Sequence, residues 1–243
     1  MGDSSDISTN LRAWQVEALQ KWESQNQRGM IEVVTGGGKT RFALAAASMW
    51  SRSQGNDWCV LVLVPTTALQ DQWYVNLVSD LKVSPGDISI WPEQRDINRK
   101  FHLMVVNTAR RSASVIVRSH KHSLVIADEC HRYASEENSI ALQQKYSAAL
   151  GLTATADREF DDGLERVLIP NLGPIIYRYT LAQARADGVV SDFSISNVKV
   201  PFTADEQEKY DRLSRALSLA ISREDPDGIK SIAMRRASVS KRA

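Results

Sequence analysis

The residues best suited to chemistry form a glycine-rich run, Thr35-Gly36-Gly37-Gly38-Lys39-Thr40, which follows an apolar segment and opens a segment of helical period. Glycines let backbone amides curl around an anion, and the start of a helix adds positive dipole. Lys39 can reach the outer phosphates of a nucleotide, and the Thr40 hydroxyl can bind magnesium. We interpret the run as a phosphate-binding loop and not a plain glycine-rich turn, although Val33 stands where such loops usually have a first glycine.

Two adjacent carboxylates, Asp128 and Glu129, follow a short apolar run at 124–127. Phosphoryl transfer is catalysed largely by placement and charge neutralisation. One carboxylate holds magnesium through its waters, and a second positions or deprotonates the attacking water. An ordinary acidic strand end has the same appearance, but here the pair follows a phosphate-binding loop by about 90 residues. The two motifs together predict a site for a magnesium nucleotide.

The elements that must position these residues alternate between short apolar runs and stretches of helical period, from residue 11 to about 200. We expect strands at 30–34, 59–64, 102–106, 124–127 and 148–152, and helices at 11–22, 40–50 and 66–78. Several of the strands are apolar at every position, which indicates that both of their faces are buried. The pattern predicts an α/β fold, a mainly parallel sheet with helices on both faces.

The pattern changes after Pro201. Residues 203–206, Thr-Ala-Asp-Glu, have the form of a capping box, and apolar residues continue at intervals of three and four to Ile221. The run Asp-Pro-Asp-Gly at 225–228 is expected to break this helix, and a second, basic helix is expected from Ile229. We therefore predict two parts: an ATP-binding domain at 1–201 and a helical extension at 202–243.

The overall charge is close to zero, with 30 Lys and Arg against 29 Asp and Glu. This excludes a uniformly basic, histone-like protein, but not a local basic surface. The two cysteines, Cys59 and Cys130, are far apart, the N-terminus is polar, and no apolar run approaches the roughly 18 residues of a membrane span. We expect a cytoplasmic protein, at the nucleoid in a bacterium or in the nucleus of a eukaryote, with no membrane partner.

Six motifs in order over residues 11–155 resemble those of superfamily 2 helicases and translocases. Residues 36–40, 128–131 and 151–155 resemble motifs I, II (a DEAD/DEAH-like box) and III, and residues 64–73 resemble motif Ia. The segment 11–19 resembles the upstream motif whose glutamine contacts adenine, and 107–109 falls where a further backbone-contacting motif is expected. Residues 151–159 and 169–177 are most similar to the XPB and UvsW branch of DNA helicases, although Ala156 replaces a proline that is frequent in related branches.

This resemblance implies a RecA-like P-loop domain that uses ATP and Mg²⁺, with Glu129, Lys39 and Asp128 in catalysis. Glu129 would be the base, and the magnesium ligands would be Thr40 and Asp128. It assigns nucleotide binding to Arg12, Gln15, Thr35, Gly36, Gly37, Gly38, Lys39 and Thr40. It assigns to His131, Thr153 and Thr155 the coupling between the nucleotide state and the surface that binds the nucleic-acid strand. It assigns contact with the nucleic-acid backbone to Pro65, Thr66, Gln72, Asn107 and Thr108. Thr66 is equally well explained as a helix N-cap.

The resemblance also implies a partner. Motors of this superfamily close ATP between two RecA-like domains, and the second supplies arginine fingers from a Gln-x-x-Gly-Arg-x-x-Arg pattern that this chain lacks. Because an arginine finger contributes roughly 10³ to 10⁵ to turnover in related enzymes, we expect this chain to bind ATP but to hydrolyse it slowly. We expect a second RecA-like domain in cis or in trans to complete the motor, and nucleic acid, DNA in the first instance, as the other partner.

Two alternatives remain open from the sequence. One is an RNA helicase or a chromatin-type remodeller of the same superfamily. The other is a nucleotide-gated binding module without motor activity, in which the amphipathic helix at 203–221 docks a partner.

Two other groups of residues invite a functional interpretation. His120, His122, Cys130 and His131 are potential zinc ligands, but their spacings match no usual zinc pattern, and we do not expect a zinc site among them. The six tryptophans could stack on bases, yet their spacings within predicted elements favour packing in the core.

Overall fold

The computed structural model describes residues 11–155, 162–191, 201–222 and 226–240. The chain divides into two compact units, Met1–Asp192 and Phe193–Ala243. Residues 156–159, which carry part of the family resemblance, lie outside the described residues.

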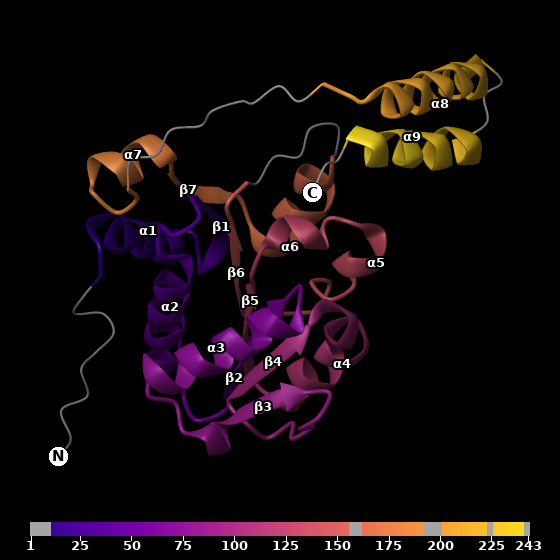
Figure 1. Ribbon diagram of the computed structural model, residues 1–243. Helices are drawn as coiled ribbons and strands as arrows, with labels where there is room; N and C mark the ends of the chain where they lie inside the picture. The colour runs from indigo at the N-terminus through magenta and orange to yellow at the C-terminus, as the bar shows by residue number, and fades with distance from the viewer. Residues whose placement is uncertain (1–10, 156–161, 192–200, 223–225, 241–243) are drawn as a thin grey trace. The chain divides into compact units, whose positions relative to one another are not determined.

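The first unit is built on a seven-stranded sheet in which every neighbouring pair of strands is parallel, in the order β3-β4-β2-β5-β6-β1-β7 (Figure 1). The strands are β1 (Arg28–Val33), β2 (Trp58–Val64), β3 (Ile88–Trp91), β4 (Phe101–Val105), β5 (His122–Ala127), β6 (Ala148–Thr153) and β7 (Ile175–Tyr179). All five strands expected from the sequence are present, and the α/β fold is confirmed.

The two strands that were not expected, β3 and β7, form the edges of the sheet. β3 has four residues, and β7 keeps most of its side chains partly exposed. β7 is covered less completely than a central strand, so it needs no continuous apolar run. β3 is largely buried, but it has only four residues, one of them Ser89, so its apolar run is too short to indicate a strand.

Helices cover both faces of the sheet. On one face lie α1 (Ala13–Ser24), α2 (Lys39–Ser53), α3 (Thr67–Ser79) and α7 (Leu181–Ala186). On the other lie α4 (Val106–Ser119), α5 (Glu136–Ser139), α6 (Ile169–Leu172), the 3-10 turn η3 (Cys130–Tyr133) and the π-helical turn η4 (Leu164–Leu168). A further short turn, η2 (Pro85–Asp87), precedes β3. α4 was not expected from the sequence, although it buries Ala109, Ala113 and Ile116 at helical spacing.

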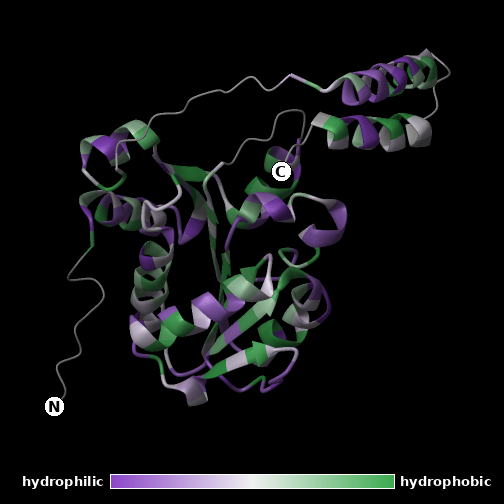
Figure 2. Cartoon of the chain, viewed as in Figure 1, coloured by the Kyte–Doolittle hydropathy of each residue, from purple (hydrophilic) through white to green (hydrophobic). Residues whose placement is uncertain are grey.

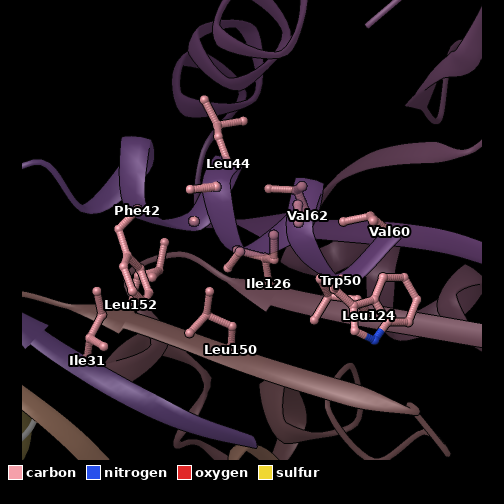
Figure 3. Close-up of a cluster of buried hydrophobic side chains, with 14 of the residues drawn as sticks. Ile31, Phe42, Leu44, Trp50, Val60, Val62, Leu124, Ile126, Leu150 and Leu152 are labelled. Carbon is pink, nitrogen blue, oxygen red and sulfur yellow. The ribbon is translucent and has the colours of Figure 1, made fainter. Parts of the chain in front are cut away.

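The core is divided by the sheet into two layers, because alternate residues of each strand point to opposite faces. In β5, Leu124 and Ile126 belong to one layer, whereas Val125 and Ala127 belong to the other. Figure 3 shows the first layer, where Phe42, Leu44 and Trp50 of α2 lie among side chains from the strands. The strands are coloured mainly as hydrophobic in Figure 2.

The tryptophans are largely core residues, as expected. Five of the six are buried, and Trp58 is partly buried. Trp14 stacks on Phe42 and Tyr179 with ring centroids 5.8 Å and 5.1 Å apart. In the part of the chain that the structure describes, no helix has the length and apolarity required to cross a membrane.

The second unit contains α8 (Ala204–Ser222) and α9 (Pro226–Ser240), which pack on each other. The capping box is present: Thr203 N–H donates to Glu206 Oε2 at 2.7 Å, and Glu206 N–H donates to Thr203 Oγ1 at 3.4 Å. Two expectations were wrong. The second helix begins at Pro226 and not at Ile229, because proline is well suited to a first helical position. Ile221, expected on the apolar face, is 56% exposed.

Candidate active site

Three neighbouring strands, β5, β6 and β1, carry the predicted motifs at their carboxyl ends. Asp128 and Glu129 follow β5, Thr153 ends β6, and the glycine-rich loop at 34–38 follows β1. Ligands of open α/β sheets bind outside the carboxyl ends of the strands. The sheet order therefore brings together residues that are more than a hundred positions apart in the chain.

The glycine-rich loop leads directly into α2, whose first residue is Lys39. Gly36 and Gly38 have positive φ angles of 80° and 104°, a conformation that residues with a side chain rarely adopt. The first amides of a helix have no carbonyl of the same helix to bind, so they are available to an anion. Val33, where a first glycine was expected, ends β1 as a buried residue, and a Cβ on Gly37 would lie 2.6 Å from its Cγ1.

Two side chains near the start of α1 hold this loop in place. Arg12 Nη1 donates to Gly37 O at 2.8 Å, and Gln15 Nε2 donates to Gly38 O at 3.0 Å. Gln15 Oε1 accepts from Arg12 N at 2.8 Å, and the Gln15 side chain is buried. Both residues were predicted to bind nucleotide, and both reach the loop.

A hollow of about 350 Å³ lies beside these contacts, lined by Arg12, Gln15, Gly36, Gly38 and Arg41. Gln15 uses its carbonyl oxygen and one hydrogen of its amide nitrogen within the protein, which leaves the second hydrogen. Contact between Gln15 and adenine stays a prediction.

Asp128 is a buried carboxylate that is held from two sides. Trp73 Nε1 donates to its Oδ2 at 2.8 Å, and the backbone N–H of Glu129 donates to its Oδ1 at 3.0 Å. Burial raises the pKa of Asp128, and the bond from Trp73 acts in the opposite direction. The sequence analysis treated Trp73 as a packing residue and missed this contact, which spans 55 positions of the chain.

Glu129 has a backbone in the left-handed region, with φ of 48°. Such a conformation costs about 1 to 3 kcal/mol in a residue other than glycine and occurs often at functional sites. Its carboxylate faces two basic groups: Oε1 lies 3.9 Å from Lys39 Nζ, and Oε2 lies 3.5 Å from His131 Nδ1. Lys39 Nζ also donates to Val33 O at 3.2 Å. The lysine of the loop and the second carboxylate therefore share one site.

His131 connects Glu129 to the end of β6. Its Nδ1 lies 2.9 Å from Thr153 Oγ1, which itself donates to Thr155 O at 2.7 Å and accepts from Thr155 N at 3.1 Å. Because the Thr153 hydroxyl gives its hydrogen to Thr155, it accepts the hydrogen from His131 Nδ1. The three residues predicted to couple the nucleotide to the nucleic-acid strand thus form one chain of contacts, in which Thr155 bonds to Thr153, Thr153 bonds to His131, and His131 faces Glu129.

A second hollow, of about 550 Å³, adjoins the loop at the carboxyl ends of β1, β6 and β7. Its lining residues are Glu32, Val34, Thr35, Ala154, Thr155, Arg178, Tyr179, Thr180 and Leu181. Arg178 Nε forms an ion pair with Glu32 Oε2 at 2.9 Å. The sequence analysis missed Arg178 because it did not identify β7. Thr35, predicted to bind nucleotide, lies in this hollow and is exposed.

The residues predicted to contact nucleic acid fall into separate places. Asn107 and Thr108, in the first turn of α4, line a hollow of about 530 Å³ with Pro92, Arg95, Arg110, Arg111 and Ser112. Gln72 is exposed on α3 and is not among the residues that line it. Pro65 and Thr66 lie between β2 and α3, and Thr66 Oγ1 accepts from Leu69 N at 3.4 Å, so Thr66 does act as an N-cap.

Comparisons with known proteins agree with this arrangement. The family described as Type III restriction enzyme, res subunit, matches residues 8–158. The DNA 3'-5' translocase XPB2 of Sulfurisphaera tokodaii is 32% identical over 208 residues, which are 85% of this chain and 44% of the relative. The putative ATP-dependent RNA helicase QP509L of African swine fever virus (isolate Tick/Malawi/Lil 20-1/1983) is 31% identical over 153 residues, 60% of this chain and 28% of the relative.

A solved structure gives the same picture of the fold. The Hef helicase domain of Pyrococcus furiosus is similar with a TM-score of 0.61 at 21% identity, covering 91% of this chain and 48% of that one. The chain thus spans less than half the length of the curated relatives described above.

Proposed function

Because the chain belongs to the family described as Type III restriction enzyme, res subunit, and its first unit has the fold of a superfamily 2 helicase motor domain, we propose that this unit is the first, ATP-binding motor domain of an ATP-dependent DNA helicase or translocase. The observation that carries the proposal is the approach of Lys39 Nζ to the Glu129 carboxylate, 3.9 Å apart, at the mouth of a loop that leads into a helix.

We assign the phosphates of ATP to Lys39 and to the amides at the start of α2, and the adenine to the hollow beside Gln15. Glu129, turned toward the site by its left-handed backbone, is suited to position or deprotonate the attacking water. When the nucleotide changes the position of the Glu129 carboxylate, His131 and Thr153 would transmit that movement to the end of β6.

Magnesium fits the residues present. The candidate ligands, the Thr40 hydroxyl and the Asp128 carboxylate, are hard oxygen donors, which Mg²⁺ prefers. Asp128 is fixed by Trp73 and by the backbone of Glu129. When bound, the ion would neutralise charge on the phosphates.

ATP binding by this chain tests the nucleotide assignment. Lys39→Ala is expected to weaken MgATP binding about 10- to 100-fold, because a hydrogen bond to a charged group contributes about 1.5 to 3 kcal/mol. Glu129→Gln is expected to leave the Kd within about threefold. The measurement is titration with a fluorescent ATP analogue.

Lys145→Ala and Glu23→Gln are matched controls, since both residues are exposed and neither lines the two hollows beside the loop. Unchanged affinity in Lys39→Ala contradicts the proposal. A loss of binding in Glu129→Gln as large as in Lys39→Ala would assign Glu129 to nucleotide binding and not to the attacking water.

We propose DNA as the nucleic acid because the relative that matches 85% of the chain is named a DNA translocase. The RNA helicase named above keeps RNA as the competing substrate. Fluorescence anisotropy with DNA and RNA strands of the same sequence distinguishes them, and tighter binding of RNA would overturn the choice of DNA.

We propose further that a second RecA-like domain, in the same chain or in another, completes the motor. ATP turnover by this chain alone should then be slow and should rise by roughly 10³ to 10⁵ when a second domain supplies arginine to the site. A chain that turns over ATP rapidly without any such domain would contradict this part of the proposal.

A further inference from the structure

Three potential metal ligands lie together at the amino end of the sheet, opposite the candidate active site. Cys59 and His102 are the second residues of the neighbouring strands β2 and β4, and His120 follows the last turn of α4. One ligand atom from each residue lies within 4.8 Å of the other two. This Cys59–His102–His120 cluster belongs to the face of the sheet that α4 covers, since the alternate strand residues Leu61 and Met104 also face that side.

The cluster contains a buried ring nitrogen without a partner. Cys59 and His102 have no exposed surface, and His120 is partly buried. Among the residues that the structure describes, no group hydrogen bonds to His102 Nε2. Buried polar atoms are almost always satisfied, so an unsatisfied one indicates a missing partner such as an ion.

His120 is oriented as a ligand. Its Nδ1 lies 3.1 Å from Ile116 O, and a carbonyl can only accept, so Nδ1 carries the hydrogen. The neutral ring therefore has its lone pair on Nε2. A backbone carbonyl that fixes the tautomer in this way is the usual support for a metal-binding histidine. The rings of His102 and His120 meet edge to face, with centroids 6.0 Å apart.

We propose that Cys59, His102 and His120 bind one Zn²⁺ ion, or another divalent ion that accepts sulfur and imidazole ligands. Sulfur with two imidazoles is a donor set that zinc prefers, and the fourth tetrahedral position would go to water. Bond lengths of about 2.3 Å to sulfur and 2.0 Å to nitrogen separate the ligand atoms of a tetrahedral site by roughly 3.3 to 3.7 Å. The three residues would have to close by about 1 Å.

Trp91 is the group that opposes this closure. Its Nε1 donates to His102 Nδ1 at 3.3 Å, so the neutral His102 ring carries its hydrogen on Nε2. When the ion binds Nε2, that hydrogen moves to Nδ1 and the bond from Trp91 is broken. The Cys59 thiol releases its proton to solvent as the sulfur–metal bond forms. One proton leaves the protein for each ion bound.

The ion would tie β2, β4 and the end of α4 together, so its binding would add to the stability of the fold. Of the four residues considered as zinc ligands from the sequence, only His120 takes part. Cys130 is instead buried behind the candidate active site, where its Sγ lies 3.9 Å from Met30 Sδ.

Titration of the metal-free 243-residue chain with Co²⁺, a spectroscopic substitute for zinc, tests the proposal. We expect one Co²⁺ per chain, with a thiolate-to-cobalt charge-transfer band and the visible bands of tetrahedral cobalt, both removed by Zn²⁺. Cys59→Ala should abolish the charge-transfer band. His120→Gln should weaken binding more than about 100-fold, since even outer-shell changes cost 10- to 100-fold.

The chain offers matched controls for both variants. Cys130→Ala and His122→Gln remove the other cysteine and the neighbouring histidine, and both should leave the cobalt spectrum unchanged. Trp91→Phe should tighten binding, because it removes the donor that competes for His102. Circular dichroism checks that each variant is folded. A spectrum without the charge-transfer band, or one that survives in Cys59→Ala, overturns the proposal.

Discussion

The strands of the sheet end at its carboxyl edge, which carries the candidate active site, and begin at its amino edge, which carries the Cys59–His102–His120 cluster. These two edges, which are distinct from the edge strands β3 and β7, differ in how their polar residues are stabilised. At the carboxyl edge, Lys39, Glu129 and His131 are partly exposed and face one another as charged or chargeable groups. At the amino edge, Cys59 and His102 are fully buried and uncharged, and one ring nitrogen has no partner among the described residues. The first edge can exchange a ligand with solvent. The second is enclosed, so its polar groups bear on the stability of the fold.

Burial favours the neutral form of the titratable group at both edges, so it shifts the two pKa values in opposite directions. It raises the pKa of Asp128 at the carboxyl edge and so disfavours the charged carboxylate there. It lowers the pKa of His102 at the amino edge to about 4 and so keeps the imidazole neutral. At the carboxyl edge, a neighbouring tryptophan counteracts the effect.

The largest expected loss of stability comes from replacing a glycine at the amino edge. Two glycines, Gly173 at the amino edge and Gly38 at the carboxyl edge, have the same φ of 104° and can be compared. A Cβ on Gly173, beside the start of β1, would lie 2.8 to 3.1 Å from backbone atoms of Gly29 and Arg28, which cannot move aside. Gly173→Ala should therefore lower the free energy of unfolding by about 3 kcal/mol or more, combining overpacking with the strain of a positive φ. Urea unfolding measures the loss.

Gly38→Ala is the matched change at the carboxyl edge. There a Cβ would meet the ends of the Gln15 and Arg12 side chains, at 3.0 and 3.3 Å, and would lie 3.9 Å from the Trp14 ring, which is an ordinary contact distance. The loss of stability should be smaller, about 1 to 2 kcal/mol from backbone strain, while ATP affinity falls. Equal stability losses in the two variants would contradict the proposed difference between the edges.

The next largest effect is a loss of folding stability at acid pH, which arises from His102 at the amino edge. The folded His102 has a pKa of about 4, against 6.5 for an ordinary histidine. As the pH falls below 6.5, the unfolded chain takes up a proton that the folded protein resists, so stability is lost between pH 6.5 and 4. The full difference corresponds to about 3 kcal/mol.

Urea unfolding at a series of pH values, with a chelator present, measures this dependence. His102→Gln should flatten the stability profile between pH 6.5 and 4, whereas Lys145→Ala should not. A profile that is unchanged by His102→Gln would show that another group is responsible.

The smallest effect compares two buried tryptophans. Trp73 donates to Asp128 at the carboxyl edge, and Trp22 Nε1 donates to Ala149 O at the amino edge, at 3.0 Å. Replacing either by phenylalanine removes one buried donor and should cost about 1 to 3 kcal/mol of stability. Trp73→Phe alone should also reduce the Mg²⁺ dependence of ATP binding, because Asp128 loses its fixed position.

Isothermal titration with MgATP and with metal-free ATP separates the two tryptophans. If Trp22→Phe changes the Mg²⁺ dependence of ATP binding as much as Trp73→Phe does, then the hydrogen bond from Trp73 to Asp128 has no particular role in metal binding. The assignment of Asp128 as a magnesium ligand then loses its support.

The motifs that gather at the carboxyl edge could be identified from the sequence, because each is a short run that follows a strand. The strands β1, β2, β4, β5 and β6 could also be identified, because each contains a short apolar run. The contact between Trp73 and Asp128 spans 55 positions, and the amino-edge cluster joins residues from two strands and a helix end. Contacts of that kind follow from the order of strands in the sheet, which no local pattern encodes.

The edge strands and the first residues of α9 were missed for a different reason. β7 contains Arg178 and keeps most of its residues partly exposed, so it lacks the apolar run of a central strand. In the second unit, the run Asp-Pro-Asp-Gly was expected to break the first helix, and α8 does end at Ser222. The error was the start of the second helix, which is Pro226 and not Ile229, because proline fits the first position of a helix.

The hold of α1 on the glycine-rich loop has a consequence for protein engineering. Arg12 and Gln15 bond to carbonyl oxygens, which every residue possesses, so the loop is fixed without reference to its side chains. Arg41 lines the same hollow, and for it the described residues provide no hydrogen bond to the loop. Under the proposed assignment of the adenine to this hollow, position 41 offers a place to change the preference for the nucleotide base while Arg12 and Gln15 keep their bonds to the loop.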